Sequence, residues 1–449
     1  MKPLSTCSAM ALSIFLVGCA AAPVRDDTRV QHAIADASAG APRLPTNGES
    51  YLDDAWFSQE LTPERAVQAA LLNNPQVRAE LSRLDAAQAE RIQAGLLRNP
   101  MGSLMALRPE GGGRFELDYS LMQSLFDLFT RSRRTKVADI AQERVQAEVM
   151  MQLVLITQNT EAAYYEALTV NGNLRLQQER LELEQTSLNL QTRQARQGVV
   201  SSTAVLSQQA AVSTQAHALR ASEAEQVQAL SALAQLLGLS STKLLLLPDH
   251  FPALEITDFN EPQLQALALK HRPDLAAANA SIDQARAEKK LQTGALRATE
   301  PSIGPIGMRE SGGMTLNGLG AQITLPVFDT GRARGALADA QIAQAQFRAE
   351  ATRRAIPLDV ERALATLIAN TNALEHAEHH VRQQLQLETL VTRNYQQGNG
   401  DYMQLVDAKR LRLFAQSEEL QAQRMIRTAL VELERATGVA IQDGQFRSP

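Results

Sequence analysis

The sequence predicts a mainly helical chain with a small transmembrane β-barrel, in which long coiled-coil helices belong to two tandem helix–β-hairpin–helix repeats. Three observations favour this fold class. Aromatic residues make up only 4% of the 449 residues, which argues against several compact globular cores because aromatic side chains dominate core energetics. Ala, Leu, Gln, Glu and Arg fill most of the chain, as in long helices. Four short sequence anchors recur in one order after about 200 residues, as in a duplicated unit.

The chain begins like the precursor of a bacterial lipoprotein. Lys2 is positive and residues 9–17 are apolar, but this run is too short to cross a membrane. The segment from Leu16 to Cys19 (LVGC) has the form of a lipobox. We therefore expect residues 1–18 to be a signal peptide and Cys19 to carry a covalent lipid such as palmitate. The alternative is an ordinary signal peptide with a chance cysteine.

The segment after the signal is polar and contains several prolines, so residues 19–60 are predicted to be a mostly extended linker. Cys7 leaves with the signal, so no thiol remains for a disulfide or a zinc cluster. The net charge is −5 with both signs mixed and no basic stripe, so a nucleic-acid partner is not expected. Beyond the N-terminus, no run of about 20 apolar residues predicts a membrane-spanning helix.

The rest of the chain is one unit written twice, at residues 61–247 and 258–440, followed by a tail at 441–449. Each copy opens near a proline, continues to a Phe-Asp pair followed by arginines, and then has a Gln-Gly pair and a closing glycine. Generic helical bias explains the Ala and Leu of both copies but not these paired positions. The anchors are Pro75 and Pro273, Phe126-Asp127 and Phe328-Asp329, Gln197-Gly198 and Gln397-Gly398, and Gly238 and Gly438.

Two shorter helices are predicted at the start of the first copy. Thr62 is suited to cap a helix that has Pro63 in its first turn. A second helix is predicted from Pro75 to Arg98, where Asn99-Pro100 ends it.

A β-hairpin is expected at about residues 101–126 and again at about 302–327. From residue 114 to 121, apolar and polar side chains alternate, as in a strand with two different faces. The first strand of each hairpin has a weaker pattern, and Pro305 lies inside one of them. The apolar face holds Phe115, Leu117 and Tyr119, and the polar face holds Arg114, Glu116 and Asp118.

A very long helix follows each hairpin. In the first copy it is predicted over residues 131–197, which at 1.5 Å per residue is about 100 Å. Its apolar residues step by four and three from Val149 to Leu188, a period of about 3.5 residues that is typical of coiled coils. The chain then reverses at Gly198 and returns over 202–237. The second copy repeats this over 333–397 and 402–437.

Helices of this length must pack side by side. The strands pose a different problem, because their outer edges must be paired. An open sheet edge is not tolerated in lipid, and four strands per chain cannot close a barrel. Two chains would give a filled barrel of about eight strands, whereas three chains give about twelve strands and a lumen. We therefore predict a homotrimer in which Arg114, Glu116 and Asp118 line water and the apolar face meets lipid.

The lipobox, the repeated helix–hairpin–helix plan, the Phe-Asp-plus-Arg junctions and the Gln-Gly tips resemble those of TolC-like outer-membrane efflux proteins, over residues 60–440. The resemblance implies a trimeric periplasmic α-barrel joined to a shared 12-stranded β-barrel in the outer membrane. It also implies two partners, a periplasmic membrane-fusion adaptor and an inner-membrane efflux pump. No cofactor is expected besides the lipid on Cys19.

The same resemblance implies roles for the helix tips and for the segment after the second tip. The tips would dock the adaptor, although turn chemistry alone also requires glycine there. The following segment would form the periplasmic aperture; the alternative is a solvated face, because Asp407 and Arg410 could pair within one helix. The docking residues are Gly198, Val199, Val200, Gly398 and Asn399, and the aperture residues are Tyr395, Met403, Asp407 and Arg410.

Other clusters give weaker signals. His376, His379 and His380 have a helical spacing that could bind a divalent metal, but we interpret them as a solvated face because no Cys or loop ligand joins them. Several methionines gather near the strands, and we interpret them as apolar filler rather than as a path for soft metals. No catalytic motif occurs, so an enzyme is not expected. The methionines are Met101, Met105, Met122, Met308 and Met314.

The resemblance leads us to expect a passive exit duct for small molecules or metal ions that a pump delivers. Two alternatives stay open, a duct for type I protein secretion and a periplasmic coiled-coil scaffold lipoprotein. A scaffold does not need the lipid-facing side chains Phe115, Leu117 and Tyr119.

Overall fold

The computed structural model describes residues 44–45, 51–254, 259–293, 299–442 and 445–446. The expected signal peptide (1–18) and lipidated Cys19 lie outside the described residues. The described chain is mainly helical with small sheets, which confirms the mainly α part of the predicted fold class. It forms two compact units, one from residues 82–142 and 287–336, and the other from the remaining described segments.

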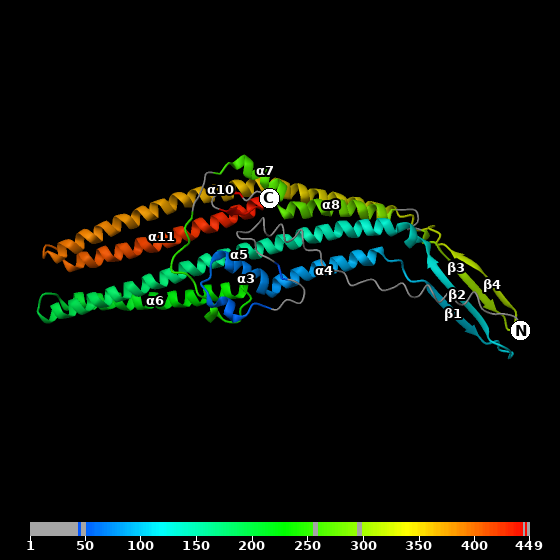
Figure 1. Cartoon of the computed structure of the whole chain (residues 1–449), viewed down its shortest axis with the longest axis horizontal. Coiled ribbons are helices and arrows are strands. Elements are labelled where there is room, and N and C mark those ends of the chain that lie inside the picture. Colours follow the sequence, from blue (N-terminus) through cyan, green and yellow to red (C-terminus); the bar gives the residue numbers. More distant parts are fainter. Residues whose placement is uncertain (1–43, 46–50, 255–258, 294–298, 443–444, 447–449) are drawn as a thin grey trace. The chain divides into compact units, whose positions relative to one another are not determined.

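The order helix, helix, strand, strand, long helix, helix occurs between residues 63 and 236 and again between 261 and 437 (Figure 1). We call these stretches the first and second halves. The elements are η2 (Asp54–Ser58), α3 (Pro63–Asn73), α4 (Pro75–Gly95), β1 (Met101–Leu107), β2 (Glu116–Ser124), α5 (Leu125–Arg196), α6 (Ser202–Leu236), η3 (Thr242–Leu244), α7 (Glu261–His271), α8 (Pro273–Gln292), β3 (Ser302–Arg309), β4 (Thr315–Gln322), α10 (Arg332–Gln396), α11 (Tyr402–Thr437), β5 (Ile441–Gln442) and β6 (Gln445–Phe446).

Residues 51–60, expected to be the end of an extended linker, are instead packed. They contain η2, and Phe57 is buried. The Arg65 guanidinium lies over the Trp56 ring at 4.2 Å and donates a hydrogen bond to the Trp56 carbonyl at 2.6 Å. The predicted cap of α3 is confirmed, because the Thr62 hydroxyl accepts the N–H of Arg65 at 3.3 Å.

The proline openings contact the closing glycines. The Asn73 side-chain amide donates to the carbonyl of Leu237, beside Gly238, at 2.9 Å. In the second half the backbone of Arg272 packs against Gly438, and its guanidinium donates to a carbonyl at the end of α11 at 3.5 Å. Helix ends leave carbonyls without intrahelical partners, so these side chains complete the C-termini of α6 and α11. The opening proline and the closing glycine are far apart in the sequence, and in each half the segments that hold them contact each other.

In the first unit, β1 to β4 form one antiparallel sheet in chain order. β2 covers 116–124 instead of the predicted 114–121. The β2–β3 ladder is interrupted at Pro305, which has no N–H to donate. β1 and β4 are the outer strands, so within the described residues each presents an edge without a neighbouring strand.

The long helix of the first half begins at Leu125, directly after β2, and not at the predicted Arg131. Asp127 lies in its first turn, where the helix dipole favours a carboxylate. The buried Asp127 side chain lies 3.3 Å from Nη1 of Arg134 and 3.6 Å from Nε of Arg98. The Phe-Asp-plus-Arg anchor therefore fixes the start of α5, which continues for 72 residues.

The coiled-coil seam predicted for α5 is confirmed, because each of its positions from Val149 to Leu188 is buried or half-buried. α6 returns along α5, with the Gln226 amide 2.7 Å from the Asn171 side-chain oxygen. α11 returns along α10 in the same way (Figure 1). Pro357 lies inside α10, where it removes one backbone hydrogen bond.

Each half has its own apolar core in the second unit, where the short helices meet the long ones. Leu71, Leu153 and Leu233 are fully buried in the first half, and Leu264 and Ile426 in the second. The tail adds the short β5–β6 pair, which the sequence did not predict. Over the described residues, no helix combines the length and the apolar character needed to cross a bilayer.

Candidate functional site

The two helix tips have the same backbone geometry. Gly198 has φ +75° and Gly398 has φ +77°, which confirms that both reversals need the left-handed conformation that glycine adopts freely. In each tip the N–H after the glycine donates to a carbonyl near the end of the preceding helix, at 3.0 and 2.9 Å. Among the predicted docking residues, Val200 is half-buried and Gly198, Val199, Gly398 and Asn399 are exposed.

Near the second tip, Arg410 of α11 makes a two-pronged contact with Glu184 of α5. Nε lies 2.7 Å from Oε1 and Nη2 lies 2.6 Å from Oε2. The Glu184 side chain is only 10% exposed. Burial by itself would raise its pKa, but hydrogen bonds from Arg410 and Gln208 hold the pKa of Glu184 below its usual value. A charged link therefore joins the helical hairpins of the two halves.

Neutral polar side chains extend this link to α6. The Gln208 amide donates to Oε2 of Glu184 at 2.6 Å. The Gln191 amide lies 3.5 Å from Oε1 of Gln208 and 3.4 Å from the sulfur of Met403. We call these four residues, together with Arg410, the tip network. Removing one member leaves buried polar partners unsatisfied, so the network acts as a unit.

The predicted aperture residues divide between this network and its edge. Arg410 and Met403 belong to the network, whereas Asp407 is 61% exposed and lies 3.0 Å from Arg410 Nη1 in the same helix. That intrahelical pair is the alternative considered from the sequence. The rings of Tyr395 and Tyr402 lie 5.8 Å apart at the second tip, where they bridge α10 and α11.

The sequence did not point to Glu184, Gln191 or Gln208. Glu184 did leave a signal, because it falls on the seam of α5 where coiled coils normally place apolar residues. The two glutamines left none, because glutamine is frequent all along these helices.

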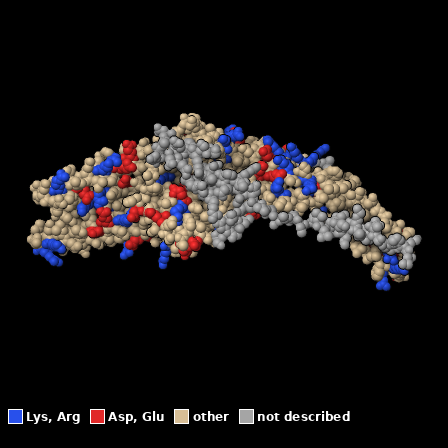
Figure 2. Space-filling view, in the orientation of Figure 1, with Lys and Arg blue, Asp and Glu red and all other residues tan. Residues whose placement is uncertain are grey.

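Charged contacts continue along α11 away from the tip. Arg412 contacts Glu179 of α5 and lies 2.6 Å from Glu388 of α10. Arg424 lies 3.0 Å from Glu166 of α5. Figure 2 shows charges of both signs interspersed over the long helices. An exposed pair such as Arg424–Glu166 contributes about 0–1 kcal/mol, whereas the Arg412–Glu388 pair, with side chains 13% and 19% exposed, is buried about as deeply as the Arg410–Glu184 pair.

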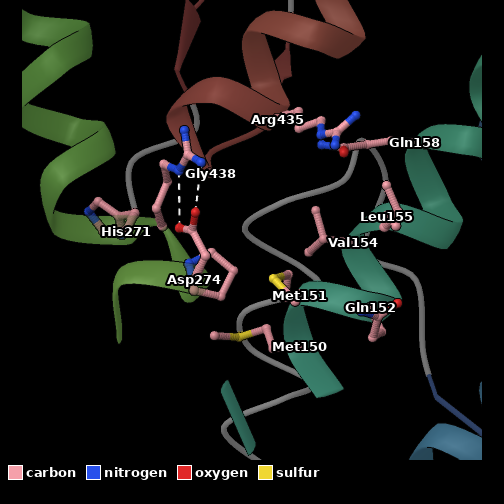
Figure 3. A pocket seen from close by; sticks show the side chains of 12 residues that line it. Met150, Met151, Gln152, Val154, Leu155, Gln158, His271, Asp274, Arg435 and Gly438 are labelled. Atoms are coloured by element: carbon pink, nitrogen blue, oxygen red, sulfur yellow. Dashed lines mark hydrogen bonds and ion pairs between the residues drawn. The ribbon is translucent and has the colours of Figure 1, made fainter. Parts of the chain in front are cut away.

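A cavity of about 320 Å³ lies where α5, the start of α8 and the end of α11 meet (Figure 3). Met151 and Val154 of α5 belong to its apolar wall. On the opposite wall, Arg272 pairs with Asp274 at 2.7 Å and with Asp359 at 3.0 Å. Asp359 also pairs with Arg362 at 3.0 Å, so the two carboxylates and two guanidinium groups neutralise one another and we assign the cavity no ligand.

In the first unit, the alternation of β2 places Glu116 and Asp118 on one face and Leu117 and Tyr119 on the other, as predicted. Arg114 precedes the strand, so it is not part of the polar face of the ladder. Tyr119 is 43% exposed within this single chain. The face that holds Leu117 and Tyr119 is therefore exposed in the single chain and can be covered by another apolar surface.

The candidate histidines are not brought together as a metal site. Nδ1 of His380 lies 2.9 Å from Oε2 of Glu418 on α11, and both side chains are exposed. In the part of the chain that the structure describes, no three His, Cys, Asp or Glu side chains are arranged to hold a metal. His376 and His379 join no such group.

The junctions between the strands and the long helices differ in burial. In the first half Phe126 is 2% exposed, and the N–H of Leu125 donates to the carbonyl of Pro301, just before β3, at 2.8 Å. In the second half the equivalent Phe328 is 99% exposed and Val327 is 71% exposed. The first junction is therefore buried and hydrogen-bonded to the second half, whereas Val327 and Phe328 of the second junction are exposed.

Comparison with known proteins points to one family. The family model described as outer membrane efflux protein matches residues 66–239 and 264–439. The chain is 28% identical over 407 residues to protein CyaE of Bordetella pertussis, covering 83% of each chain. It is 26% identical over 459 residues to the toluene efflux pump outer membrane protein TtgF of Pseudomonas putida, covering 93% of this chain and 92% of TtgF.

Solved structures share the fold. The outer membrane protein VceC from Vibrio cholerae matches with a TM-score of 0.67 at 19% identity, covering 84% of this chain and 96% of VceC. The Campylobacter jejuni CmeC outer membrane channel matches with a TM-score of 0.68 at 15% identity, covering 88% of this chain and 90% of CmeC.

Proposed function

The chain belongs to the outer membrane efflux protein family, and on this premise we propose that three copies form the exit duct of a tripartite efflux system. The duct passively exports small molecules or metal ions across the outer membrane. An inner-membrane pump supplies the energy, and a periplasmic adaptor joins the pump to the duct.

The exposed second junction carries this proposal. A phenylalanine that is 99% exposed beside an exposed valine needs a cover, whereas at the equivalent junction of the first half Phe126 is buried and Pro301 accepts the N–H of Leu125. The residue equivalent to Pro301 in the first half is Pro100, which directly precedes β1. Pro100 of a second copy would therefore cover Val327 and Phe328, and β1 of that copy would pair with β4.

Head-to-tail pairing of this kind continues until the ring closes, and closure removes every open edge. Three copies of a four-stranded sheet give about twelve strands, which leave a water-filled lumen. Glu116 and Asp118 then face the lumen, and Arg114 lies at its rim. The exposed apolar side chains Leu104, Tyr119 and Leu319 face lipid.

The long helices form the periplasmic part of the duct. The tips at Gly198, Val199, Val200, Gly398 and Asn399 dock the adaptor, and the exposed Val199 supports this role. The tip network restrains the narrow end, where Tyr395, Met403, Asp407 and Arg410 surround the aperture. Opening requires the hairpin of the second half to separate from α5, which breaks the Arg410–Glu184 pair.

The proposal includes a lipid on Cys19 as an anchor in the outer membrane. Cys19→Ser should abolish labelling of the protein with radioactive palmitate. Unchanged labelling would refute the lipid anchor but would leave the proposed duct unaffected.

The duct is tested by reconstitution. Full-length, processed protein purified in detergent should have the mass of a trimer and should give discrete conductance steps in planar lipid bilayers. A stable monomer that never conducts would contradict the proposal and favour the scaffold alternative.

A further inference from the structure

All four methionines of the strands lie on one face of the sheet. In the β1–β2 ladder Met101 stands opposite Met122 and Met105 stands opposite Asp118. In the β2–β3 ladder Asp118 also stands opposite Met308. Side chains directly opposite one another in a ladder share a face, so one row reads Met105, Asp118, Met308 across three strands.

The placement runs against the general pattern of the sheet. The other face carries most of the aliphatic and aromatic side chains, including Leu104, Leu117 and Tyr119, yet it carries no methionine within the four strands. Filler methionines would be expected on that apolar face. Here they accompany the acidic residues Glu116 and Asp118, on the face that the proposed function turns toward the lumen.

Asp118 is unusual within this row. Its Oδ1 is inaccessible to solvent and has no hydrogen-bond partner among the described residues. Neighbouring strands lie about 4.8 Å apart, so the backbones of Met105 and Met308 are about 10 Å apart with Asp118 between them. The two long thioether side chains can both reach a point above the carboxylate.

This combination has a definite ligand chemistry. Thioether sulfur prefers soft monovalent ions such as Cu(I) and Ag(I), whereas carboxylate alone prefers hard divalent ions. Two thioethers and one carboxylate supply soft donors and a single compensating negative charge. The Met101–Met122 pair offers two further thioethers about 13 Å along the strands.

We propose that Met105, Asp118 and Met308 form a transit site for Cu(I) or Ag(I) in the duct, with Met101 and Met122 as a second step. This inference rests on the proposed function, because only a closed barrel turns this face toward water. It narrows the cargo of the duct to include soft monovalent metal ions. No electron transfer is involved, since the ion enters and leaves in the same oxidation state.

The test is equilibrium dialysis of the full-length trimer in detergent with silver nitrate in a chloride-free buffer. Wild-type protein should bind Ag(I), and Met105→Leu with Met308→Leu should weaken binding at least tenfold, because leucine keeps the volume but removes the sulfur. The matched control is Met150→Leu with Met425→Leu, which removes two thioethers from the long helices. Magnesium nitrate serves as the hard-ion probe and should show no loss of binding in either variant.

Equal Ag(I) affinity in wild type and in the Met105/Met308 variant, or no Ag(I) binding by wild type, would overturn the transit site. The same preparations are assayed for trimer mass and for conductance. If wild type conducts as a trimer while the silver result is negative, only the transit site fails. If wild type neither assembles nor conducts, the proposed function itself fails.

Discussion

In the proposed duct, Glu184 is the residue on which closure of the tip should depend most. It is the only member of the tip network that combines a charge with a side chain only 10% exposed, and it meets Arg410 and Gln208 together. Asp407 holds the same arginine from a side chain 61% exposed. A buried partner that loses its counterpart leaves an unsatisfied charge, whereas a solvated one is rehydrated.

We therefore expect Glu184→Gln to raise the resting conductance of reconstituted trimers and Asp407→Asn to change it little. Loss of the charge on Glu184 should weaken the closed tip by roughly 1–3 kcal/mol, the usual effect of leaving a buried hydrogen-bonding group without its partner. The measurement is the open probability in planar bilayers at pH 7. Asp407→Asn is the matched control, and an open probability higher in Asp407→Asn than in Glu184→Gln would refute this assignment.

The Arg410–Glu184 pair should make the stability of the closed tip depend on pH. Because the folded protein holds the pKa of Glu184 below its usual value, the pair contributes stability above the ordinary carboxyl pKa. That contribution is lost as the pH falls through the lowered pKa. Acidification should therefore open the wild-type tip, and Glu184→Gln should lack this response.

The pKa of Glu161 is shifted in the opposite direction to that of Glu184. Glu161 lies almost fully buried on α5, where burial and then the charge of Glu64 raise its pKa to about 8. One turn away, Nε2 of Gln158 is buried and has no hydrogen-bond partner among the described residues. A carboxyl in this position is neutral in the folded protein at neutral pH.

The sign of its effect on stability follows. Since the unfolded pKa is about 4.3, the folded state binds the extra proton between that pH and about 8, and the free energy of unfolding falls as the pH rises through this window. Glu161→Gln should remove the fall and stabilise the protein at pH 9 by on the order of 2–4 kcal/mol. The apparent Tm in detergent at pH 5 and pH 9 measures this, with the exposed Glu182→Gln as control. A wild-type Tm that does not depend on pH in this window, or a variant that loses stability at pH 9, would be inconsistent with it.

At the scale of elements, the bounds of helices and strands are best predicted where a single sequence periodicity dominates. The seam of α5, both tips and the bounds of α11 followed from the spacing of apolar residues and from two Gln-Gly pairs. The start of α5 did not, because Leu125 to Thr130 (LFDLFT) is as apolar as a strand, and the contacts that accompany its helical start, from Asp127 to Arg98 and Arg134 and from Leu125 to Pro301, are tertiary. The shift of β2 by two to three residues has the same origin, since ladder partners rather than local alternation set where the strand ends.

The tips lend themselves to a test at this scale. A side chain at a φ near +75° costs roughly 1–2 kcal/mol, so Gly198→Trp with Gly398→Trp should distort the reversals and leave the rest of the helices intact. We expect trimers of normal mass, together with at least a tenfold loss of adaptor cross-linking and impaired efflux. Gly111→Trp, at the open hairpin turn with no atom within 4 Å of a new Cβ, is the matched control. Wild-type efflux in the double tip variant would mean that the adaptor docks elsewhere.

At the scale of the whole molecule, the sequence predicted a duct because four strands cannot close a barrel and three chains give enough strands for a lumen, and the resemblance implied the same trimer. The structure adds a reason that a single sequence does not contain, namely the unequal burial of Phe126 and Phe328. Phe126 is buried in one half and Phe328 is exposed in the other, which supports the proposal that a second copy covers Phe328. The tip network escaped prediction for a related reason, since it brings together residues more than 200 positions apart whose types are common throughout the helices.

The most direct measurement of the central claim is a disulfide across the proposed seam between copies. Pro100→Cys with Val327→Cys places one thiol on each side of that seam, and Leu125→Cys with Pro301→Cys places the equivalent pair within one chain, where a hydrogen bond of 2.8 Å already joins the two residues. Under mild oxidation the Pro100/Val327 pair should give covalent trimers on non-reducing gels, whereas the Leu125/Pro301 pair and each single variant should run as monomers. A Pro100/Val327 variant that stays monomeric, in membranes where the Leu125/Pro301 disulfide forms, would contradict the closed ring and with it the duct.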